Sequence, residues 1–263
     1  MQNAPTMRLA VISDVHGNAL ALRAVLRALE QESVTEIICL GDLVGYNAQP
    51  REVIQMIRDH GILSVHGNHD LMVLGRLPVA GGPRAKRAIA WTAATLALED
   101  RMFLLGLPET LVRHERHLFV HSAMGDPVLR LKTPDQFENQ RRVLGQSLPA
   151  VRVCFTGHTH EPGAWELPWG RRPAPHPEAA LGLRRDSFYF VNPGSVGEPR
   201  GSDHRASFAL YDGALERITF HRVPYDRPRL LRENARRGLT VEQASRVRRL
   251  GHRALAAARR LFA

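Results

Sequence analysis

Short polar clusters follow short apolar runs at five points of the sequence, and this arrangement constrains the fold more than any other feature. The runs are rich in Val, Ile, Leu and Phe, as buried strands are. They span residues 9–13, 37–40, 62–65, 118–120 and 153–156, and the clusters after them are Asp14-Val15-His16, Gly41-Asp42, Gly67-Asn68-His69-Asp70, His121 and Gly157-His158-Thr159-His160. Ligands collect beyond the carboxyl ends of strands in open α/β sheets, so we expect the clusters to converge there.

These clusters predict a hydrolytic site with two divalent metal ions. Asp42 is the expected bridge, because one carboxylate can give an oxygen to each ion while offsetting their repulsion. Asp14 and His16 are two positions apart, so their side chains point the same way if the strand geometry persists. We therefore expect both at the first ion.

The remaining candidate ligands are an amide and three imidazoles. Asn68 and His121 suit the second ion, and His158 and His160 can be divided between the two ions. Mixed carboxylate, imidazole and amide ligands favour manganese, iron, zinc or nickel over calcium. The sequence does not distinguish among these metals.

A metal pair of this kind predicts in-line displacement at phosphorus. The expected nucleophile is a hydroxide that bridges the ions, since coordination lowers the pKa of water to about 7 in favourable sites. His69 could donate the proton to the leaving oxygen as an imidazolium, with Asp70 or a neighbouring carboxylate orienting its ring. Asp70 could equally cap a helix that begins near Leu71.

In order and spacing, these motifs resemble the signature of calcineurin-like metallophosphoesterases over residues 8–224. The segments 13–18, 41–46 and 192–197 resemble the small bacterial and archaeal branch, which is phosphodiesterase-like. The resemblance implies an α/β fold in which two sheets pack as a sandwich flanked by helices. It also implies one metal at Asp14, His16, Asp42 and His160, the other at Asp42, Asn68, His121 and His158, and His69 as the acid.

One departure bears on the substrate. Protein serine/threonine phosphatases and dinucleoside tetraphosphatases of the superfamily follow their Gly-Asp with Asp-Arg-Gly, whereas this chain has Val44-Gly45-Tyr46. The missing arginine disfavours a dedicated protein phosphatase and favours phosphodiesters, or small phosphomonoesters such as nucleotides, as substrates. Tyr46, Asn47, His66 and Arg200 are candidates to contact the substrate instead.

The rest of the pattern alternates strands with helices, which is typical of a layered α/β core. We expect helices over residues 18–30, with Asn18 as N-cap, over 51–60 and over 88–103. Residues 166–186 are rich in Pro, Gly and Arg and predict a long irregular loop. Gly194-Ser195 predicts a turn after a strand, and less strongly a backbone donor to phosphate.

Charge is concentrated at the end of the chain. Residues 225–263 hold eleven Arg against three acidic residues, a net +8 of the chain's +10. We expect a catalytic domain over residues 1–224 and a basic helical extension over 225–263 that packs on it. A nucleic-acid arm is the alternative, but the arginines are not interleaved with aromatic residues.

The expected setting is the cytoplasm. No run approaches the roughly 20 apolar residues of a membrane helix, and residues 1–8 lack an apolar signal core. Cys39 and Cys154 lie in strand-like runs and predict buried thiols rather than a disulfide. Three other functions stay open. They are a non-catalytic metal-binding scaffold of the same fold, which the presence of His69 disfavours, a protein phosphatase or dinucleoside polyphosphate hydrolase, and a nucleic-acid phosphodiesterase guided by the basic tail. The oligomeric state is not predicted.

Overall fold

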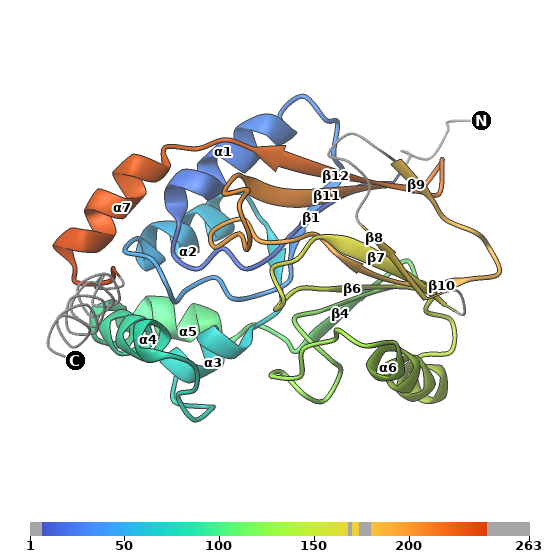
Figure 1. The fold of residues 1–263 in the computed structure, drawn as a ribbon, viewed down its shortest axis with the longest axis horizontal. Coiled ribbons are helices and arrows are strands. Elements are labelled where there is room, and N and C mark those ends of the chain that lie inside the picture. Colours follow the sequence, from blue (N-terminus) through green and yellow to red (C-terminus); the bar gives the residue numbers. More distant parts are fainter. Residues whose placement is uncertain (1–6, 168–169, 174–179, 241–263) are drawn as a thin grey trace, which may run out of the picture.

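Two mixed β-sheets pack face to face in the computed structural model, which describes residues 7–167, 170–173 and 180–240 (Figure 1). The first sheet has the order β3 (Leu63–Ser64), β2 (Glu36–Cys39), β1 (Arg8–Ile12), β11 (Ala206–Asp212), β12 (Arg217–Val223) and β9 (Ala180–Gly182). The second has the order β4 (Thr110–Arg113), β5 (His117–Val120), β6 (Val153–Thr156), β10 (Phe188–Asn192), β7 (Gly163–Leu167) and β8 (Gly170–Pro173).

Alternation along β1 explains the layers. Leu9 and Val11 pack between the sheets, among residues such as Phe119 and Phe155 of the second sheet. The side chains between them point to the opposite face, where they join a core that includes residues of the helices. A strand whose two faces are both buried reads as a continuous apolar run, which is why these segments stand out in the sequence.

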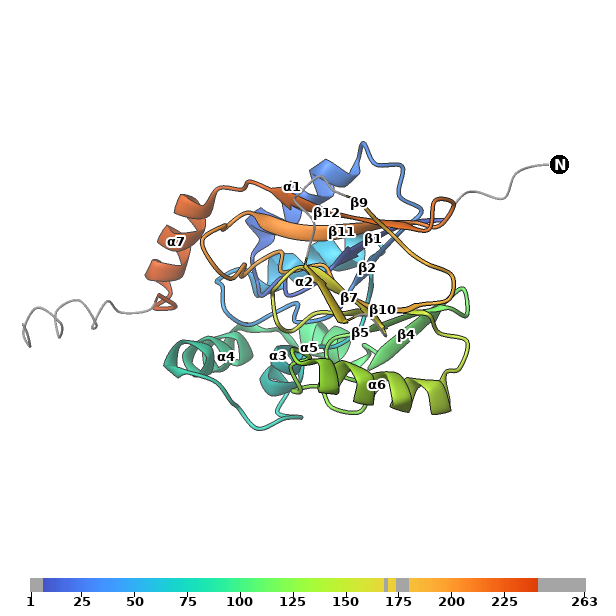
Figure 2. The same ribbon diagram turned by 45° about the vertical axis from the view of Figure 1, so that its right-hand side comes forward.

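Helices cover both outer faces of the sandwich (Figure 2). Those that share the first sheet's core are α1 (Ala19–Leu29), α2 (Pro50–Asp59), α3 (Asn68–Val73), α4 (Pro83–Thr95) and α5 (Leu98–Leu105), while α6 (Pro134–Ser147) covers the second sheet. Asn18 caps α1, since its side chain accepts a hydrogen bond from the Ala21 N–H. The expected two-sheet sandwich flanked by helices is confirmed.

The parallel strands bring their carboxyl ends to one edge. In the first sheet β1, β2 and β3 run parallel, and in the second β5, β6 and β10 do. The polar clusters follow these strands directly. The convergence predicted from the sequence therefore has its structural basis in two sets of parallel strands that end on the same side of the sandwich.

Two predictions about secondary structure were wrong. The helix expected over 88–103 is two helices, because Leu96 has an extended backbone and the Asp100 carboxylate accepts from the Ala97 N–H to begin α5. The loop expected over 166–186 contains the end of β7 together with β8 and β9. The strands β8 and β9 lie at sheet edges, where proline and glycine are tolerated and composition is a weak guide.

The described part of the basic extension packs on the rest of the fold through α7 (Arg227–Arg236). Asn234 is buried, its side-chain Oδ1 accepts from the Ala48 N–H at 3.0 Å, and its side-chain Nδ2 donates to Asn47 Oδ1 at 2.8 Å. The helix prediction for residues 241–263 lies outside the described residues. Over the part of the chain that is described, no helix has the length and apolar character needed to cross a membrane. Both cysteines are buried free thiols, as predicted.

Candidate metal centre

The loops after β1, β2 and β6 adopt left-handed backbone conformations at the candidate ligands. The φ angles are 54° at Asp14, 50° at His16, 52° at Asp42, 64° at His158 and 61° at His160. Such angles are uncommon for residues other than glycine and concentrate at functional sites. They correct the sequence argument for Asp14 and His16, since β1 ends at Ile12 and left-handed turns, not strand pleating, bring these two side chains together.

Asp14, His16 and His160 form a first group of buried side chains. The Nε2 atoms of His16 and His160 lie 3.2 Å apart, and Asp14 Oδ1 lies 3.3 Å from His160 Nε2. The Nδ1 atom of His16 faces the Val44 carbonyl at 3.3 Å, and that of His160 faces the Glu198 carbonyl at 2.6 Å. Each Nδ1 therefore donates its proton to a carbonyl, so both Nε2 atoms present lone pairs to the same point.

A second group contains Asp42, Asn68, His121 and His158. His121 Nδ1 donates to the Leu40 carbonyl at 2.8 Å, which leaves its Nε2 lone pair 2.9 Å from Asn68 Oδ1, another acceptor. His158 Nε2 lies 3.1 Å from the Val128 carbonyl, so its Nδ1 is left to act as a ligand. Ligand atoms of Asp42, His121 and His158 all lie within 4.8 Å of one another.

Asp42 lies between the two groups. Its Oδ2 is 3.5 Å from His16 Nε2 and 3.5 Å from His121 Nε2. Its Oδ1 accepts from the backbone N–H of His69 at 2.7 Å. Burial, followed by the charges of neighbouring carboxylates, raises the pKa of Asp42 well above its usual range. The structure thus places one buried carboxylate where it could serve both groups.

The site has acceptors without matching donors, which is the chemistry of a cation site. Asp14 Oδ1 is buried and has no hydrogen-bond partner among the described residues. Burial lowers the pKa of His121 to about 3 and of His158 to about 4, so their rings stay neutral near pH 7. Buried acceptors of this kind need a compensating partner. Two divalent ions fit this donor set, one in each group.

His69 lies beside both groups, with its ring centroid 4.7 Å from that of His16 and 4.8 Å from that of Tyr46. Its buried Nδ1 has no hydrogen-bond partner among the described residues. Burial, followed by the neighbouring imidazoles, lowers the pKa of His69 to about 3. The predicted imidazolium thus requires a negative substrate beside the ring, because the free site disfavours it.

Gly45 makes room for the His69 ring. Its φ is 134°, and a Cβ added there would lie 2.5 Å from His69 Nδ1 and 3.0 Å from His16 Nδ1. Any side chain at this position would collide with both rings.

The Asp70 carboxylate accepts hydrogen bonds from backbone N–H groups and not from the His69 ring. Its Oδ2 accepts from the Gly67 N–H at 2.9 Å and its Oδ1 from the Val44 N–H at 3.1 Å. The carboxylate is fully buried and sits in the first turn of α3. The helix begins at Asn68 with Gly67 as its N-cap, so Asp70 is the third residue of α3 and not the cap of a helix that begins near Leu71. Its carboxylate accepts from the N-cap N–H, and no hydrogen bond joins it to the His69 ring among the described residues.

The four candidate substrate contacts differ in their surroundings. Tyr46 lies against His16, with ring centroids 4.7 Å apart, and is half-buried. Asn47 is buried, donates to the His16 carbonyl at 3.0 Å and accepts from α7, so its predicted contact with substrate is replaced by a structural role. Arg200 is exposed and close enough that its charge helps to lower the pKa of His69. His66 belongs to none of the His and Asp groups described above.

Gly194-Ser195 forms the predicted turn. The Gly194 N–H donates to Asn192 Oδ1 at 2.8 Å, and the φ of Gly194 is 81°. The Ser195 hydroxyl donates to the Asp14 carbonyl at 2.8 Å and accepts from the Glu198 N–H at 2.8 Å. This turn therefore braces the loop that carries Asp14.

Sequence reasoning missed two arginines near the site. Arg130 is exposed, and its charge acts on both Asp42 and His158. Arg84, near the start of α4, pairs with Glu198 and stacks on Tyr46. Neither comes directly after a strand, so no motif marked them. The signal for Arg130 was its position on the loop after β5, whose end carries His121.

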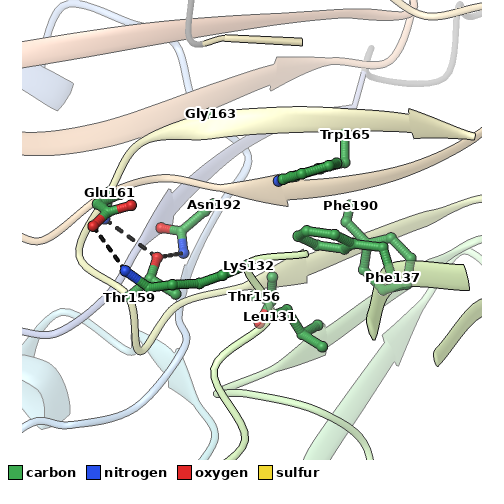
Figure 3. Close-up of a pocket in the computed structure, with 10 residues that line it drawn as sticks. All are labelled: Leu131, Lys132, Phe137, Thr156, Thr159, Glu161, Gly163, Trp165, Phe190 and Asn192. Atoms are coloured by element: carbon green, nitrogen blue, oxygen red, sulfur yellow. Dashed lines mark hydrogen bonds and ion pairs between the residues drawn. The ribbon is translucent and has the colours of Figure 1, made fainter. Parts of the chain in front are cut away.

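A pocket of about 200 Å³ lies behind the 157–161 loop (Figure 3). Phe137, Trp165 and Phe190 form its apolar end, and the Lys132–Glu161 ion pair, 3.0 Å between Nζ and Oε1, lies at the other. Thr159 lines it from the same loop that carries His158 and His160. None of the candidate ligands lines this pocket, so it is separate from the metal centre.

The sequence matches the family model described as the calcineurin-like phosphoesterase superfamily domain over residues 7–214. The chain belongs to this superfamily. The protein named uncharacterized protein MJ0912, from Methanocaldococcus jannaschii, is 34% identical over 229 residues, covering 83% of this chain and 88% of that protein.

Solved structures agree with this calcineurin-like fold. A metallophosphoesterase from Sphaerobacter thermophilus superposes with a TM-score of 0.74 at 33% identity, covering 89% of this chain and 95% of that one. The hypothetical protein PH1004 from Pyrococcus horikoshii OT3 gives 0.72 at 23% identity, covering 90% and 95%. The resemblance to small bacterial and archaeal members is confirmed, and calcineurin-like membership supports phosphoester hydrolysis in general and a divalent metal cofactor.

Proposed function

We propose that this protein is a two-metal phosphoesterase that prefers phosphodiesters to phosphomonoesters. The proposed ligands are Asp14, His16, Asp42 and His160 for one ion and Asp42, Asn68, His121 and His158 for the other. The observation that carries the proposal is the 3.2 Å separation of the Nε2 atoms of His16 and His160, with the Asp42 carboxylate between them and the second group. Manganese, iron, zinc and nickel all suit these ligands.

Bound ions would supply a nucleophilic water of lowered pKa and would stabilise the charge of the phosphate. The chain's own contribution is to orient the ligands through carbonyl contacts such as that of His121 with Leu40. His69 is proposed to hold a proton for the leaving oxygen. A phosphate beside its ring raises the His69 pKa from the low value of the free site, because the negative charge favours the imidazolium.

The preference for diesters is supported by the loop after β2. Val44-Gly45-Tyr46 places a glycine and a phenol where related phosphatases have an arginine, so no fixed cation from this loop meets a doubly charged monoester. Exposed Arg130 and Arg200, on two other loops, are proposed to attract the anionic substrate.

Turnover by manganese-loaded protein tests the proposal. We expect hydrolysis of bis-p-nitrophenyl phosphate with a higher kcat/KM than that of p-nitrophenyl phosphate, and elemental analysis should give two ions per chain. Activity should disappear with a chelator and return with metal. Bound metal without turnover on either substrate would favour the scaffold, and a higher kcat/KM for the monoester would contradict the diester preference.

Nucleic-acid cleavage guided by the tail is a separable alternative. Because α7 packs on Asn47 and Ala48, a truncation should retain residues 1–240 and remove 241–263. Weaker cleavage of DNA or RNA with unchanged hydrolysis of bis-p-nitrophenyl phosphate would support the tail's role. An equal effect on both substrates would count against it.

A further inference from the structure

Arg84 contacts both Glu198 and Tyr46, which lie beside candidate metal ligands, although it belongs to none of the sequence motifs. Both of its terminal nitrogens contact the Glu198 carboxylate, with Nη2 and Oε2 3.0 Å apart. The pair is largely shielded from solvent, with exposures of 26% and 18%. A two-point contact of this kind fixes the plane of the guanidinium.

The guanidinium lies over the Tyr46 ring, with Cζ 4.8 Å from the ring centroid. Tyr46 in turn contacts the rings of His16 and His69, at centroid distances of 4.7 and 4.8 Å. The phenol ring is therefore held between Arg84 and two imidazoles of the site. Stacking of this type is favourable, and more so when it is shielded from water.

Glu198 is itself held rigidly. Its N–H donates to the Ser195 hydroxyl at 2.8 Å, and its carbonyl accepts from His160 Nδ1 at 2.6 Å. The ion pair thus connects Arg84 to the same backbone unit that orients a candidate metal ligand. The carboxylate that binds Arg84 therefore belongs to a residue whose backbone is fixed by two hydrogen bonds.

The charge of Arg84 is already matched by Glu198, so this arginine is poorly suited to hold a phosphate itself. Among the described residues, Tyr46 has no hydrogen-bond partner for its hydroxyl, which leaves that group available to a ligand. The loop after β2 therefore offers the Tyr46 hydroxyl to a ligand, and Arg84 stacks on the ring that carries this hydroxyl.

We propose that Arg84 is a positioning residue that holds the Tyr46 hydroxyl for contact with the substrate phosphate. This inference rests on the proposed function, because it assumes that a phosphate ester binds at the metal centre. It adds a residue that neither the motifs nor the candidate ligands include, and it gives the Arg84–Glu198 pair a role beyond stability.

The test compares three changes in manganese-loaded protein. Tyr46→Phe keeps the ring and removes the hydroxyl, Arg84→Gln with Glu198→Gln removes the pair without changing net charge, and the third variant combines them. Tyr46→Phe should raise KM for bis-p-nitrophenyl phosphate about three- to tenfold with kcat unchanged, which is the loss expected for one hydrogen bond made equally in both states. The double substitution should do the same, and the combination should add nothing further.

Two readouts separate positioning from a merely structural role. Elemental analysis should find unchanged metal content, and Arg84→Lys should raise KM although it keeps the ion pair, because lysine lacks the planar group that stacks on the ring. The Arg229→Gln with Glu233→Gln variant of α7 is the matched control, since it removes another Arg–Glu pair, 2.8 Å between Nε and Oε1. Additive effects of the Tyr46 and Arg84 changes, or metal loss in the Arg84 variant, would overturn the inference.

Binding of diphenyl phosphate, measured by isothermal titration calorimetry, gives the same comparison without turnover. The Kd should rise by the same factor in each variant. A wild-type protein that binds diphenyl phosphate without hydrolysing either chromogenic ester would contradict the proposed function alone. Unchanged Kd in the Arg84 and Tyr46 variants would contradict the positioning role alone.

Discussion

The Nε2 atoms of His16 and His160 lie 3.2 Å apart, although 144 positions separate these residues in the sequence. Each ring has its Nδ1 turned to a backbone carbonyl, of Val44 for His16 and of Glu198 for His160. Two lone pairs at this distance repel each other unless a cation or a proton lies between them. Burial lowers the pKa of His16 well below its usual value, so a metal ion is the better partner near neutral pH.

Replacing Asp42 by Asn should remove the bridge between the two groups. Asn keeps the shape of Asp42 but lacks the charge that one carboxylate shares with two cations, so we expect fewer than two ions per chain. Turnover should fall by about 100-fold or more, since such ions supply several kcal/mol of charge stabilisation. Elemental analysis and steady-state kinetics measure both. Two tightly held ions in Asp42→Asn would show that this carboxylate does not bridge them.

Replacing His69 by Ala should separate proton transfer from metal binding. The ring of His69 contacts His16 and Tyr46 but is not among the proposed ligands, so metal content should stay at the wild-type value. The kcat should fall by roughly 100-fold, the usual size of a general acid contribution. A kcat equal to wild type would remove His69 from the mechanism.

Replacing Gly45 by Ala should displace the His69 ring while leaving the imidazole group itself unchanged. The new Cβ would lie 2.5 Å from His69 Nδ1, and a shift of about 1 Å in a catalytic group can lower turnover by about 100-fold. Gly75→Ala is the matched control, because Gly75 also has a positive φ, 71°, but open space around an added Cβ. Gly75→Ala should lose about 1 kcal/mol of stability and Gly45→Ala more, because its Cβ also meets two rings, and only Gly45→Ala should lose activity.

The stability of the protein should depend on pH through His117. This ring is 4% exposed, packs on Tyr211 with centroids 4.8 Å apart, and has its pKa lowered to about 4 by burial. In the unfolded chain this imidazole binds its proton at about pH 6.5. The free energy of unfolding therefore falls by up to about 3 kcal/mol as the pH falls from about 6.5 to about 4, and this contribution does not change further below that pH.

His117→Leu should remove this part of the acid sensitivity. Urea unfolding at pH 7 and pH 4 should show a smaller difference for the variant than for wild type. His60→Leu removes an exposed imidazole and serves as the control. Identical pH dependence in wild type and His117→Leu would mean that the ring is not held neutral by the fold.

The strands could be predicted, and the candidate ligands singled out, because both leave short-range signals. A buried strand is an apolar run of a few residues, and a polar cluster directly after it is visible without coordinates. Asp14, Asp42 and His158 were identified as candidates in this way. The order of strands in each sheet was not predictable from the residues, because it depends on pairing between segments far apart in the chain.

The misplaced details share a physical cause, since each depends on contacts that sequence spacing does not encode. Asp70 looked like a partner of His69, but its oxygens accept backbone N–H groups of Gly67 and Val44. Asn47 looked like a loop residue and is fixed by Asn234, 187 positions away. Arg84 could not be found by motif because its role arises from a helix that packs beside the site.

The candidate ligands come from both sheets, with Asp14 and Asp42 following strands of the first sheet and His121, His158 and His160 following strands of the second. If the proposed function is right, each cation therefore binds residues of both sheets and holds the two sheets together. Since ions that bind only the folded chain raise its stability by mass action, chelation should lower the midpoint of thermal unfolding as well as abolish turnover. The proposed catalytic centre therefore lies where the two sheets meet.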